Sequence, residues 1–460
     1  MKLSDIRATL REIHVSPVKT LGQNFLHDQN LARWIVDQAQ VTSDDYVVEI
    51  GPGLGALTKF LLEKGARVLA VEKDTRLANF LRERFADERL EVLNIDALKF
   101  DARVLFSRQR VKLLGNLPYN ISSALLLKFL THPSPISLWL FTLQKEMATR
   151  LSAQPSTHDY GALTLRTQLR HHVKYLRNVS ATVFLPRPEV DSAVVRILPR
   201  DPRELPAHDE KLLLELIRFG FSQRRKQLRK LLRERVDDWV SLASQVNINP
   251  KARAEELSLL QWIAVANFVA PSPCPDTEVT NSERFPVVDK NDRILRHASR
   301  SEVHANNLRH RAVHILIFNP AGDVYLQQRS RWKDRHPLKW DSSAAGHVIA
   351  TESYDETARR ELKEELGISV PLKKISKLPA SERTDQEFVW LYRGEIIGNF
   401  SLNRTEIETG AFFPETVIDG WAAARPEDFA PGFIECWKVY RQKSAAIAAR
   451  LLKSDKLSSR

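Results

Sequence analysis

Cysteines are scarce in this sequence: only Cys274 and Cys436 occur among 460 residues. Two such distant cysteines fit neither a disulfide framework nor a zinc site, which indicates a reducing compartment. Long hydrophobic runs are also missing, and the apolar stretches 138–143 and 313–318 are far too short to span a bilayer. The first residues, MKLSDIRATLREIH, lack the apolar core of a signal peptide. We therefore expect a cytoplasmic protein with no membrane partner.

Acidic residues are fewer than basic ones. The chain has 57 Asp and Glu against 69 Lys and Arg, which gives a formal net charge of +12. A surplus of this size favours a polyanionic partner, with nucleic acid as the first expectation and an anionic membrane surface as the second. The hydrophobic fraction of 43% supports real cores, and the length suggests two to four domains.

Two patterns of hydrophobic residues divide the chain. Between about 46 and 195, short apolar runs alternate with amphipathic stretches, which predicts an α/β domain with a largely parallel sheet. From 206 to about 269 the pattern is helical and includes a basic run at 222–235. The segment 271–283 is rich in Pro, Ser and Thr and lacks a hydrophobic period, so it is the best linker candidate. Beyond it, RAVHILIF, a turn at NPAGD and VYLQQR predict a hairpin, and a strongly charged helix follows.

A glycine turn follows the first predicted strand of the α/β part. The strand YVVEI runs into Gly51, Gly53 and Gly55, which allow a ligand to approach the backbone closely. The next strand ends in Glu72, where a carboxylate can accept hydrogen bonds from two ribose hydroxyls. The third strand ends in Asp96, which either accepts a bond from an adenine amino group or is simply solvated. These residues together predict a nucleoside-containing cofactor.

The fourth predicted strand ends in Asn116, Leu117, Pro118 and Tyr119. The exocyclic amine of adenine is a poor nucleophile because its lone pair is delocalised into the ring. The amide oxygen of Asn116 and the carbonyl of Leu117 can accept its two N–H bonds and so orient the lone pair for in-line methyl transfer. Pro118 would fix the turn, and Tyr119 would stack on the base. The tetrapeptide therefore favours adenine methylation over nicotinamide chemistry.

Five blocks of sequence extend this interpretation: KTLGQNFL (19–26), EIGPGLGALT (49–58), GNLPYNIS (115–122), FLPRPEVDSAVV (184–195) and FSQRRKQLRKLL (221–232). Together they resemble the KsgA (RsmA) family of small-subunit rRNA adenine dimethyltransferases, over about 15–269. The resemblance implies S-adenosyl-L-methionine as cofactor and two adjacent N6,N6-dimethyladenosines near the 3′ end of 16S rRNA as products. It also implies that Asn24, Leu26, Gly51, Glu72, Asp96 and Asn116 line the cofactor site and that Phe184 and Tyr119 clamp the flipped adenine.

The sequence also suggests where RNA would bind. Phe184 is followed by Pro186 and Pro188, a pattern typical of a rigid surface loop, so we expect its ring to be a stacking platform and not a core residue. The basic run favours a phosphate-contacting surface over a merely solvated helix face. Its cations are Arg224, Arg225, Lys226, Arg229, Lys230, Arg233 and Arg235.

A second chemistry is encoded at 346–368, where GHVIATE, seven further residues and RELKEELGI form a complete Nudix box. Glu361, Glu364 and Glu365 stand at positions i, i+3 and i+4, so their carboxylates share one helix face. Such a group of hard oxygen ligands suits Mg²⁺, which would bind a diphosphate and activate a water molecule. Gly346 would let the loop backbone approach the metal. We predict Glu364 and Glu365 as catalytic residues of a pyrophosphohydrolase.

Other residues near the box have open or supporting roles. Arg360 and Glu352 would brace the loop and orient the ligands. His347 is either a metal ligand or a loop residue, and the sequence does not decide between them. Glu406 and Glu408 are either a further ligand or base from a later loop, or plain surface acids.

The wider segments 285–319 and 326–348 resemble the branch of Nudix proteins related to isopentenyl diphosphate isomerase. That isomerase uses a cysteine immediately before the Gly-His pair, where this chain has Ala344 and Ala345. We therefore expect hydrolysis of a nucleoside diphosphate or other diphosphate compound, whose identity the sequence does not reveal.

The predicted architecture is α/β throughout. It comprises a Rossmann-like methyltransferase domain (1–200), a small helical RNA-binding domain (201–270), a linker (271–283), an α/β Nudix hydrolase domain (284–445) and a basic tail (446–460). Three alternatives stay open: a 23S rRNA methyltransferase, a DNA adenine N6-methyltransferase, and a ribosome-assembly RNA-binding factor with little catalysis. DNA enzymes usually carry a doubled proline where Leu117 stands, and intact Asn116 and Glu72 argue against a non-catalytic factor.

Overall fold

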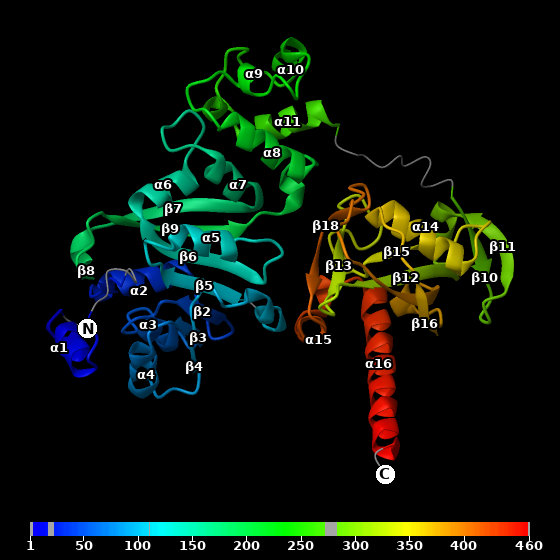
Figure 1. The fold of residues 1–460 in the computed structure, drawn as a ribbon, viewed down its shortest axis with the longest axis horizontal. Helices are drawn as coiled ribbons and strands as arrows, with labels where there is room; N and C mark the ends of the chain where they lie inside the picture. Colours follow the sequence, from blue (N-terminus) through cyan, green and yellow to red (C-terminus); the bar gives the residue numbers. More distant parts are fainter. Residues whose placement is uncertain (1–2, 17–22, 110, 272–282, 459–460) are drawn as a thin grey trace. The chain divides into compact units, whose positions relative to one another are not determined.

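The computed structural model describes residues 3–16, 23–109, 111–271 and 283–458, with side chains up to 446. Its contacts divide the chain into two compact units, Met1–Ser272 and Pro273–Arg460 (Figure 1). The predicted linker lies almost entirely outside the described residues. The α/β class predicted for the chain is confirmed in both units. Within the described ranges, no helix is both long and apolar enough to cross a bilayer.

A mixed seven-stranded sheet forms the centre of the first unit, in the order β4-β3-β2-β5-β6-β9-β7. The first five strands of this order run parallel, and β9 is antiparallel to both β6 and β7. The strands are β2 (Tyr46–Ile50), β3 (Arg67–Glu72), β4 (Leu90–Asn94), β5 (Val111–Asn116), β6 (Ile136–Gln144), β7 (His171–Val179) and β9 (Ser192–Pro199).

Both faces of this sheet are covered by apolar residues. Along β2, Val48 belongs to one buried cluster and Val47 to the other, and Leu113 and Leu114 repeat this alternation on β5. Helices α5 (Ser122–Phe129) and α6 (Lys145–Ser152) contribute to the first cluster, and α2 (Gln29–Gln38) and α3 (Thr58–Glu63) to the second. Since side chains alternate along a strand, this two-sided burial explains the near-continuous apolar runs in the sequence.

The strand order reverses at β2, with β3 and β4 on one side and β5 and β6 on the other. In open α/β sheets, ligands bind beyond the carboxyl ends of the strands at such a point. The short strand β1 (Phe25–Leu26) pairs with β8 (Phe184–Leu185) in a separate two-stranded sheet. Helices α1 (Leu3–Glu12) and α4 (Thr75–Arg84) share a small apolar cluster through residues such as Leu10 and Leu77.

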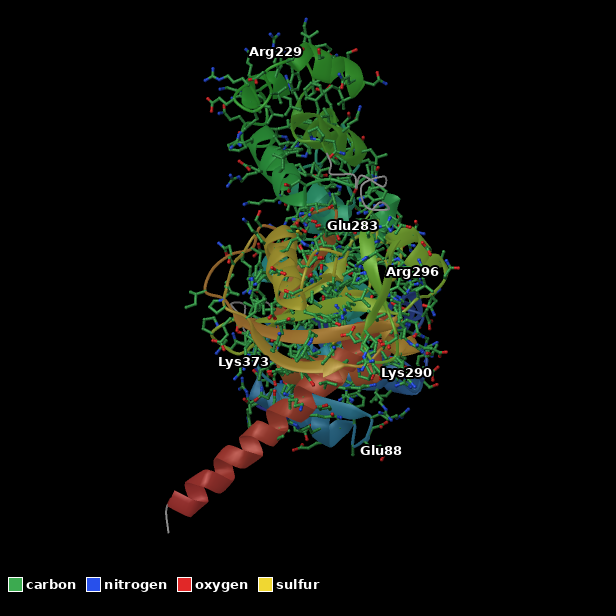
Figure 2. The ribbon with its side chains drawn as sticks, turned by 90° about the vertical axis from the view of Figure 1, so that its right-hand side faces the viewer. Glu88, Arg229, Glu283, Lys290, Arg296 and Lys373 are labelled. Carbon is green, nitrogen blue, oxygen red and sulfur yellow. The ribbon has the colours of Figure 1, made fainter. Side chains whose placement is uncertain are left out.

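The remainder of the first unit is helical, as expected, but the basic run does not form a continuous helix. Only α9 (Leu228–Leu231) lies within 222–235, and turns make up most of the remainder. Two of its leucines, Leu228 and Leu232, are fully buried, so one helical turn is enough to anchor the run. Arg229, on α9, is labelled in Figure 2. The other helices of this part are α7 (Ala162–Arg170), α8 (Glu210–Gly220), α10 (Trp239–Gln245) and α11 (Leu259–Val269).

The second unit has its own seven-stranded sheet, in which β14-β13-β12-β17-β16 are consecutive, β15 pairs with β12 and β18 pairs with β13. The predicted hairpin of β12 and β13 is confirmed. The strands are β12 (His310–Phe318), β13 (Val324–Arg329), β14 (Trp340–Asp341), β15 (Ala344–His347), β16 (Lys373–Leu378), β17 (Glu387–Glu395) and β18 (Ile407–Phe413). A two-stranded sheet joins β10 (Arg284–Val288) to β11 (Ile294–Ser299).

Helix α14 (Tyr354–Leu366) packs on this sheet through Leu362 and Leu366, which share a buried cluster with Val313. Ser353 begins the helix with a capping box, and Gly367 ends it in the left-handed conformation at φ 67°. These two residues fix where the helix begins and ends, and so where its glutamates lie. Helices α13 (Arg300–Ala305), α15 (Glu415–Ala424) and α16 (Pro431–Ser458) complete the unit, and α16 includes most of the predicted tail.

Candidate functional sites

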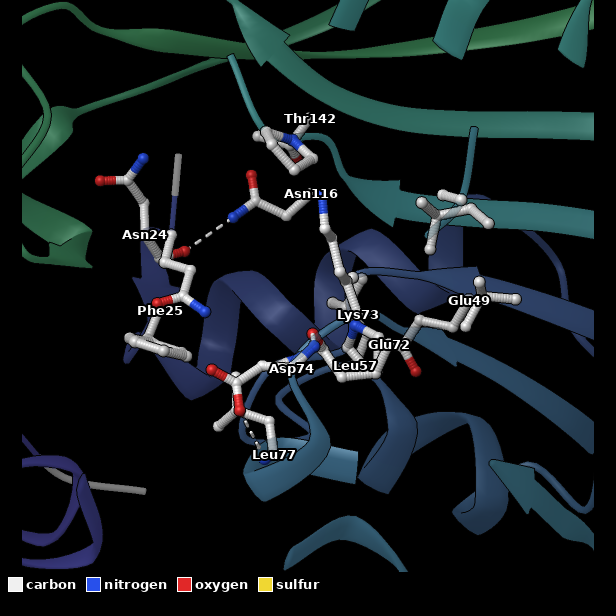
Figure 3. A pocket seen from close by; sticks show the side chains of 18 of the residues that line it. Asn24, Phe25, Glu49, Leu57, Glu72, Lys73, Asp74, Leu77, Asn116 and Thr142 are labelled. Carbon is white, nitrogen blue, oxygen red and sulfur yellow. Dashed lines mark hydrogen bonds between the residues drawn. The ribbon is translucent and has the colours of Figure 1, made fainter. Parts of the chain in front are cut away.

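A cavity of about 210 Å³ opens at the carboxyl ends of β2, β3 and β5 (Figure 3). Most of the residues predicted to bind the cofactor or the reacting base line it. These are Asn24, Leu26, Gly51, Gly53, Glu72, Asp96, Asn116 and Pro118. Four predicted residues lie outside its lining: Gly55, Leu117, Tyr119 and Phe184.

The three glycines of the turn after β2 have two different roles. Gly51 and Gly53 have φ of 65° and 58°, a left-handed backbone that other residues rarely adopt, and both line the cavity. At Gly55 an added Cβ would lie 2.3 Å from the ring of Phe85. Gly55 also has a left-handed backbone, at φ 77°, and it packs closely against Phe85 without lining the cavity.

Glu72 is held at the end of β3 by two backbone donors. Gly53 N donates to Oε2 at 3.2 Å, and Asp74 N donates to Oε1 at 2.9 Å. The side chain is only 6% exposed, and this burial raises its pKa despite the two bonds. The carboxylate is thus fixed in direction before any ligand arrives, as recognition of a ribose requires.

Asp96 lies two residues beyond β4 and pairs with Lys73, whose Nζ is 2.8 Å from Oδ2. The Lys73 hydrogen bond, with that of Leu98 N, lowers the pKa of Asp96. Sequence reasoning missed Lys73, although its position directly after the strand end at Glu72 was a signal. It also missed Glu49, a buried cavity residue that accepts a 2.6 Å bond from Thr58 and whose pKa burial raises to about 7.

Asn116 ends β5 with its amide group oriented by the chain. Its Nδ2 donates to the carbonyl oxygen of Asn24 at 2.9 Å, as Figure 3 shows. Its Oδ1 is buried and has no hydrogen-bond partner in the part of the chain that the structure describes. A buried polar atom left unpaired is unfavourable, so such an atom in a cavity is suited to receive a donor from a ligand. Leu117 keeps the turn in place, because its N–H donates to Thr142 O at 3.2 Å and its side chain is buried.

The two predicted clamp residues are not equivalent. The hydroxyl of Tyr119 hydrogen-bonds to Ser192 Oγ at 2.5 Å, which fixes the direction of the half-buried ring. Phe184 is only 3% exposed, and the expectation of an open surface platform is wrong. Its strand pairs with β1, where Leu26 lies opposite Phe184. The ring belongs to the buried apolar cluster that also contains Val47 of β2. Pro186 therefore comes directly after the short strand β8, which pairs with β1.

We expect Glu72→Ala to weaken binding of S-adenosyl-L-methionine by about ten- to a hundred-fold, the scale of losing a pair of charge-assisted hydrogen bonds. Isothermal titration calorimetry on the full chain measures this directly. Glu91→Ala, on the neighbouring strand β4, is the matched control and should bind normally. An unchanged affinity of the Glu72 variant would remove this residue from the cofactor site.

The second unit brings the predicted metal ligands together on α14. Glu365 is 2% exposed, and its Oε2 accepts bonds from Ala345 N at 3.2 Å and Gln327 Nε2 at 3.0 Å. The carboxylate of Glu361 fills the space beside Gly346, where an added Cβ would lie 2.0 Å from it. Glu364 lies at the open edge, with its side chain 55% exposed. Two of the three predicted ligands are therefore fixed by packing, and the third lies at the surface, where Arg360 Nη1 bonds to it at 2.9 Å.

Arg360 braces this group. Its Nε donates to Glu352 Oε1 at 2.8 Å, and its Nη1 lies 2.9 Å from both Glu361 and Glu364. Its Nη2 also donates to the carbonyl of His347 at 3.3 Å, which ties the loop to the helix.

The same carboxylates fit a hard cation. Burial raises the pKa of Glu361 to about 7 and raises the pKa of Glu365 well above its usual range. Oxygen donors in this number, with Gly346 leaving room, suit Mg²⁺. Glu406 is a further carboxylate near Glu365 and ion-pairs with Lys333. Glu408 pairs with Arg331, at 3.1 and 2.5 Å.

His347 lies in a different group from the helix glutamates. Ligand atoms of His304, His310 and His347 lie within 4.8 Å of one another, and Glu387 Oε1 is 3.1 Å from His347 Nε2. The buried Nε2 of His304 has no hydrogen-bond partner among the described residues, and Nε2 of His310 lies 3.5 Å from Glu387 Oε1. Imidazole and carboxylate ligands of this kind could hold a transition metal. Sequence reasoning missed His304, His310 and Glu387, because the group forms only when β12 pairs with β15 and β17 and His304 on α13 packs beside them.

Residues 17–271 match the family model described as ribosomal RNA adenine dimethylase. The chain belongs to this family. It is 41% identical over 263 residues to ribosomal RNA small subunit methyltransferase A of Chlorobium phaeobacteroides (strain BS1), an alignment that covers 57% of this chain and 97% of that protein. It is 42% identical over 257 residues to the protein of the same name from Thiobacillus denitrificans (strain ATCC 25259 / T1), covering 55% and 98%.

A crystal structure of a dimethyladenosine transferase from Plasmodium falciparum is 25% identical, covers 52% of this chain and 95% of that chain, and has a TM-score of 0.44. Residues 308–433 match the NUDIX domain model. This rRNA adenine dimethylase therefore carries a C-terminal NUDIX domain, and that match does not specify a branch within the NUDIX group.

Proposed function

We propose that the first unit transfers methyl groups from S-adenosyl-L-methionine to the N6 atoms of two adjacent adenines near the 3′ end of 16S rRNA. The observation that carries this proposal is the unpaired Oδ1 of Asn116, which faces a cavity beside a fixed turn. When the target amine donates to this oxygen and to the carbonyl of Leu117, its lone pair points along the path of transfer. Catalysis is then mainly positioning.

The cavity offers the groups that the cofactor needs. Glu72 would accept bonds from the ribose hydroxyls, and Asp96 would accept one from the adenine amino group. Gly51 and Gly53 allow the ligand to lie against the backbone. S-adenosyl-L-methionine supplies the electrophilic methyl group, and the chain orients the amine that attacks it. Tyr119, held by Ser192, would stack on the extruded base.

The names of the similar proteins favour the small subunit as the substrate. Both are called small subunit methyltransferase A, and this chain covers nearly their whole length. A 23S rRNA or DNA substrate is the alternative. Parallel incubation with under-methylated 30S subunits, 50S subunits and duplex DNA tests the choice, and we expect methyl incorporation with 30S subunits alone.

We propose that the basic run binds rRNA phosphates. Arg224, Arg225 and Lys226 are exposed side by side, and Arg224 is oriented by a hydrogen bond to the carbonyl of His158. Exposed cations on a short turn can follow a phosphate backbone, because each displaces condensed counterions. Figure 2 shows Arg229 of the same run.

Changing Arg224, Arg225 and Lys226 together to alanine should flatten the dependence of RNA affinity on salt. The slope of log K against log[salt] should change by about 2 to 3, because each lost phosphate contact contributes about 0.7 to 0.9. Fluorescence anisotropy at several salt concentrations gives the slope. The triple change of Lys373, Lys374 and Lys377 removes the same charge from the NUDIX domain and should leave it unaltered. An unchanged slope for the first variant would mean that these cations face away from the RNA.

We propose further that the NUDIX domain hydrolyses a diphosphate-linked compound with Mg²⁺ held by Glu361, Glu364 and Glu365. Two features support this: the near-contact of Glu361 with Gly346, and the burial of Glu365 beside Ala345 N. Glu364 and Glu365 would help to activate the attacking water. A panel of nucleoside diphosphate compounds, assayed for released phosphate with and without Mg²⁺, tests this activity.

A further inference from the structure

Three cations share one face of the first unit's sheet at its β7 edge. Lys174 lies directly opposite Arg196 in the pairing of β7 with β9, and Arg177 lies opposite Val194. Side chains two residues apart on a strand point to the same face, so all three cations lie on the face that also carries Ser192. β7 is the last strand in the order of this sheet. We call Lys174, Arg177 and Arg196 the edge cations.

The edge cations have no acidic partner. Within the described ranges, no ion pair joins any of them to a carboxylate. Lys174 and Arg177 are exposed, and the half-buried Arg196 keeps its Nε without a hydrogen-bond partner among the described residues. Like charges directly opposite each other on neighbouring strands destabilise a sheet, so the pair of Lys174 with Arg196 is unfavourable in the free protein.

The other ends of the same two strands carry charges that are paired. His172 on β7 and Arg200 just after β9 both contact Glu204, at 2.8 and 3.2 Å. The unpaired positive charge therefore lies toward the end of the edge where Ser192 hydrogen-bonds to Tyr119. Arg196 is four residues from Ser192, which corresponds to about 13 Å along an extended strand.

We propose that the edge cations bind the phosphate backbone of the rRNA strand that enters the methyl-transfer cavity. This inference rests on the proposed function of the first unit as an rRNA methyltransferase. Phosphates would supply the acidic partners that the chain lacks and would remove the repulsion between Lys174 and Arg196. Contacts of this kind position a nucleic acid without reading its sequence, so the edge would hold the strand while Tyr119 stacks on the target base.

Arg177 is oriented for such a contact. Its guanidinium group lies over the ring of Trp34 on α2, 5.3 Å from the ring centroid. A guanidinium that stacks on an aromatic face keeps its N–H donors in its own plane, where they match the geometry of a phosphate. The surface is also distinct from the basic run at 222–235, which belongs to the helical part of the unit.

Charge reversal at Lys174 separates RNA binding from folding. Lys174→Glu places a carboxylate opposite Arg196, so an unfavourable pair becomes a favourable one and the melting temperature of the full chain should rise by about 1 to 3 °C. The same change should weaken binding of under-methylated 30S subunits on the order of ten-fold at low salt, measured by filter binding. The KM for 30S subunits should rise in parallel. A purely structural role would move stability and binding in the same direction.

Two further variants test the role of charge. Arg177→Gln should make the plot of log K against log[salt] shallower by about 0.7 to 0.9, the contribution of one phosphate contact, and Arg177→Lys should retain most of the slope. Arg67→Glu is the matched control for charge reversal, because Arg67 is exposed at the amino end of β3 in the same sheet. It should bind 30S subunits as the wild type does.

Calorimetric titration with S-adenosyl-L-methionine should give the same affinity for every variant, which shows that the cofactor site is intact. Wild-type binding of 30S subunits by Lys174→Glu would overturn the proposal, and so would a loss no larger than that of Arg67→Glu. A lower melting temperature of Lys174→Glu would contradict the unfavourable pairing on which the proposal depends. If the wild-type protein neither binds nor methylates 30S subunits, the proposed function itself fails, which is a different result.

Discussion

Replacing Asn116 with alanine is expected to lower methyl transfer to rRNA by about two to three orders of magnitude. This is the scale of losing one preorganised hydrogen-bonding group at a reacting centre. The substitution removes Oδ1, which is buried and unpaired within the described part of the chain and which we propose receives the target amine. Without it, the amine has one acceptor fewer and its lone pair is no longer directed toward the methyl group.

The folded state should tolerate this change. The side chain of Asn116 donates a 2.9 Å hydrogen bond to the carbonyl of Asn24, and the residue lines the cavity. A melting curve and a calorimetric titration with the cofactor, on the same preparation, would show that folding and cofactor binding survive. Asn178→Ala, on β7, is the control for the same substitution elsewhere in the unit. Turnover near the wild-type rate by the folded Asn116 variant would disprove the assigned role.

Changing Glu364 and Glu365 together to glutamine should lower Mg²⁺-dependent diphosphate hydrolysis by at least about two to three orders of magnitude and leave rRNA methylation untouched. The change removes two charges from the ligand set while it keeps the size and shape of both side chains. The first unit and the NUDIX domain form separate compact units in their contacts. Methylation depends on strand ends in the first, and hydrolysis depends on α14 in the second.

Loss of hydrolysis should not come from unfolding. Burial raises the pKa of Glu365 well above its usual range, and glutamine keeps the size and shape of this side chain. Its bond from Ala345 N can still be accepted by an amide oxygen. Glu364 is largely exposed. Both reactions and a melting curve should be measured on one preparation, with Glu395→Gln as a surface control. If methylation fell in step with hydrolysis in folded protein, a coupled mechanism would have to replace independent domains.

Local sequence signals predicted the strands well. YVVEI and VKLLGN coincide with β2 and β5, because apolar residues that face two covered sides of a sheet form runs ended by glycine or asparagine. Helix α14 ends at Gly367, which adopts the left-handed conformation that a helix terminus favours. In each of these segments the local pattern and the tertiary environment favour the same structure.

Phe184 shows where such reasoning fails. The prolines after it correctly mark a break in regular structure, but they say nothing of the strand at Phe25 and Leu26 that covers it. That pairing joins residues about 160 positions apart, and no local pattern reports it. The helical pattern expected across the basic run is interrupted for a similar reason, because Leu228 and Leu232 anchor the run in a core that distant helices form.

The missed site residues share this cause. Lys333 meets Glu406, and His304 meets His347, only after the sheet of the NUDIX domain has formed. In the sequence alone, charged and imidazole side chains in such loops look like ordinary surface residues. Their partners are set by the folding of the sheet, which no local pattern reports.

The central claim is tested most directly by mapping the methyl groups. Under-methylated 30S subunits would be incubated with the full chain and methyl-labelled S-adenosyl-L-methionine, and the labelled RNA fragments sequenced by mass spectrometry. The account predicts label on the N6 atoms of two adjacent adenines near the 3′ end of 16S rRNA, two methyl groups on each, and none with the Asn116→Ala variant. Label at another position or on another atom, or 30S subunits left unlabelled by folded, cofactor-binding protein, would contradict it.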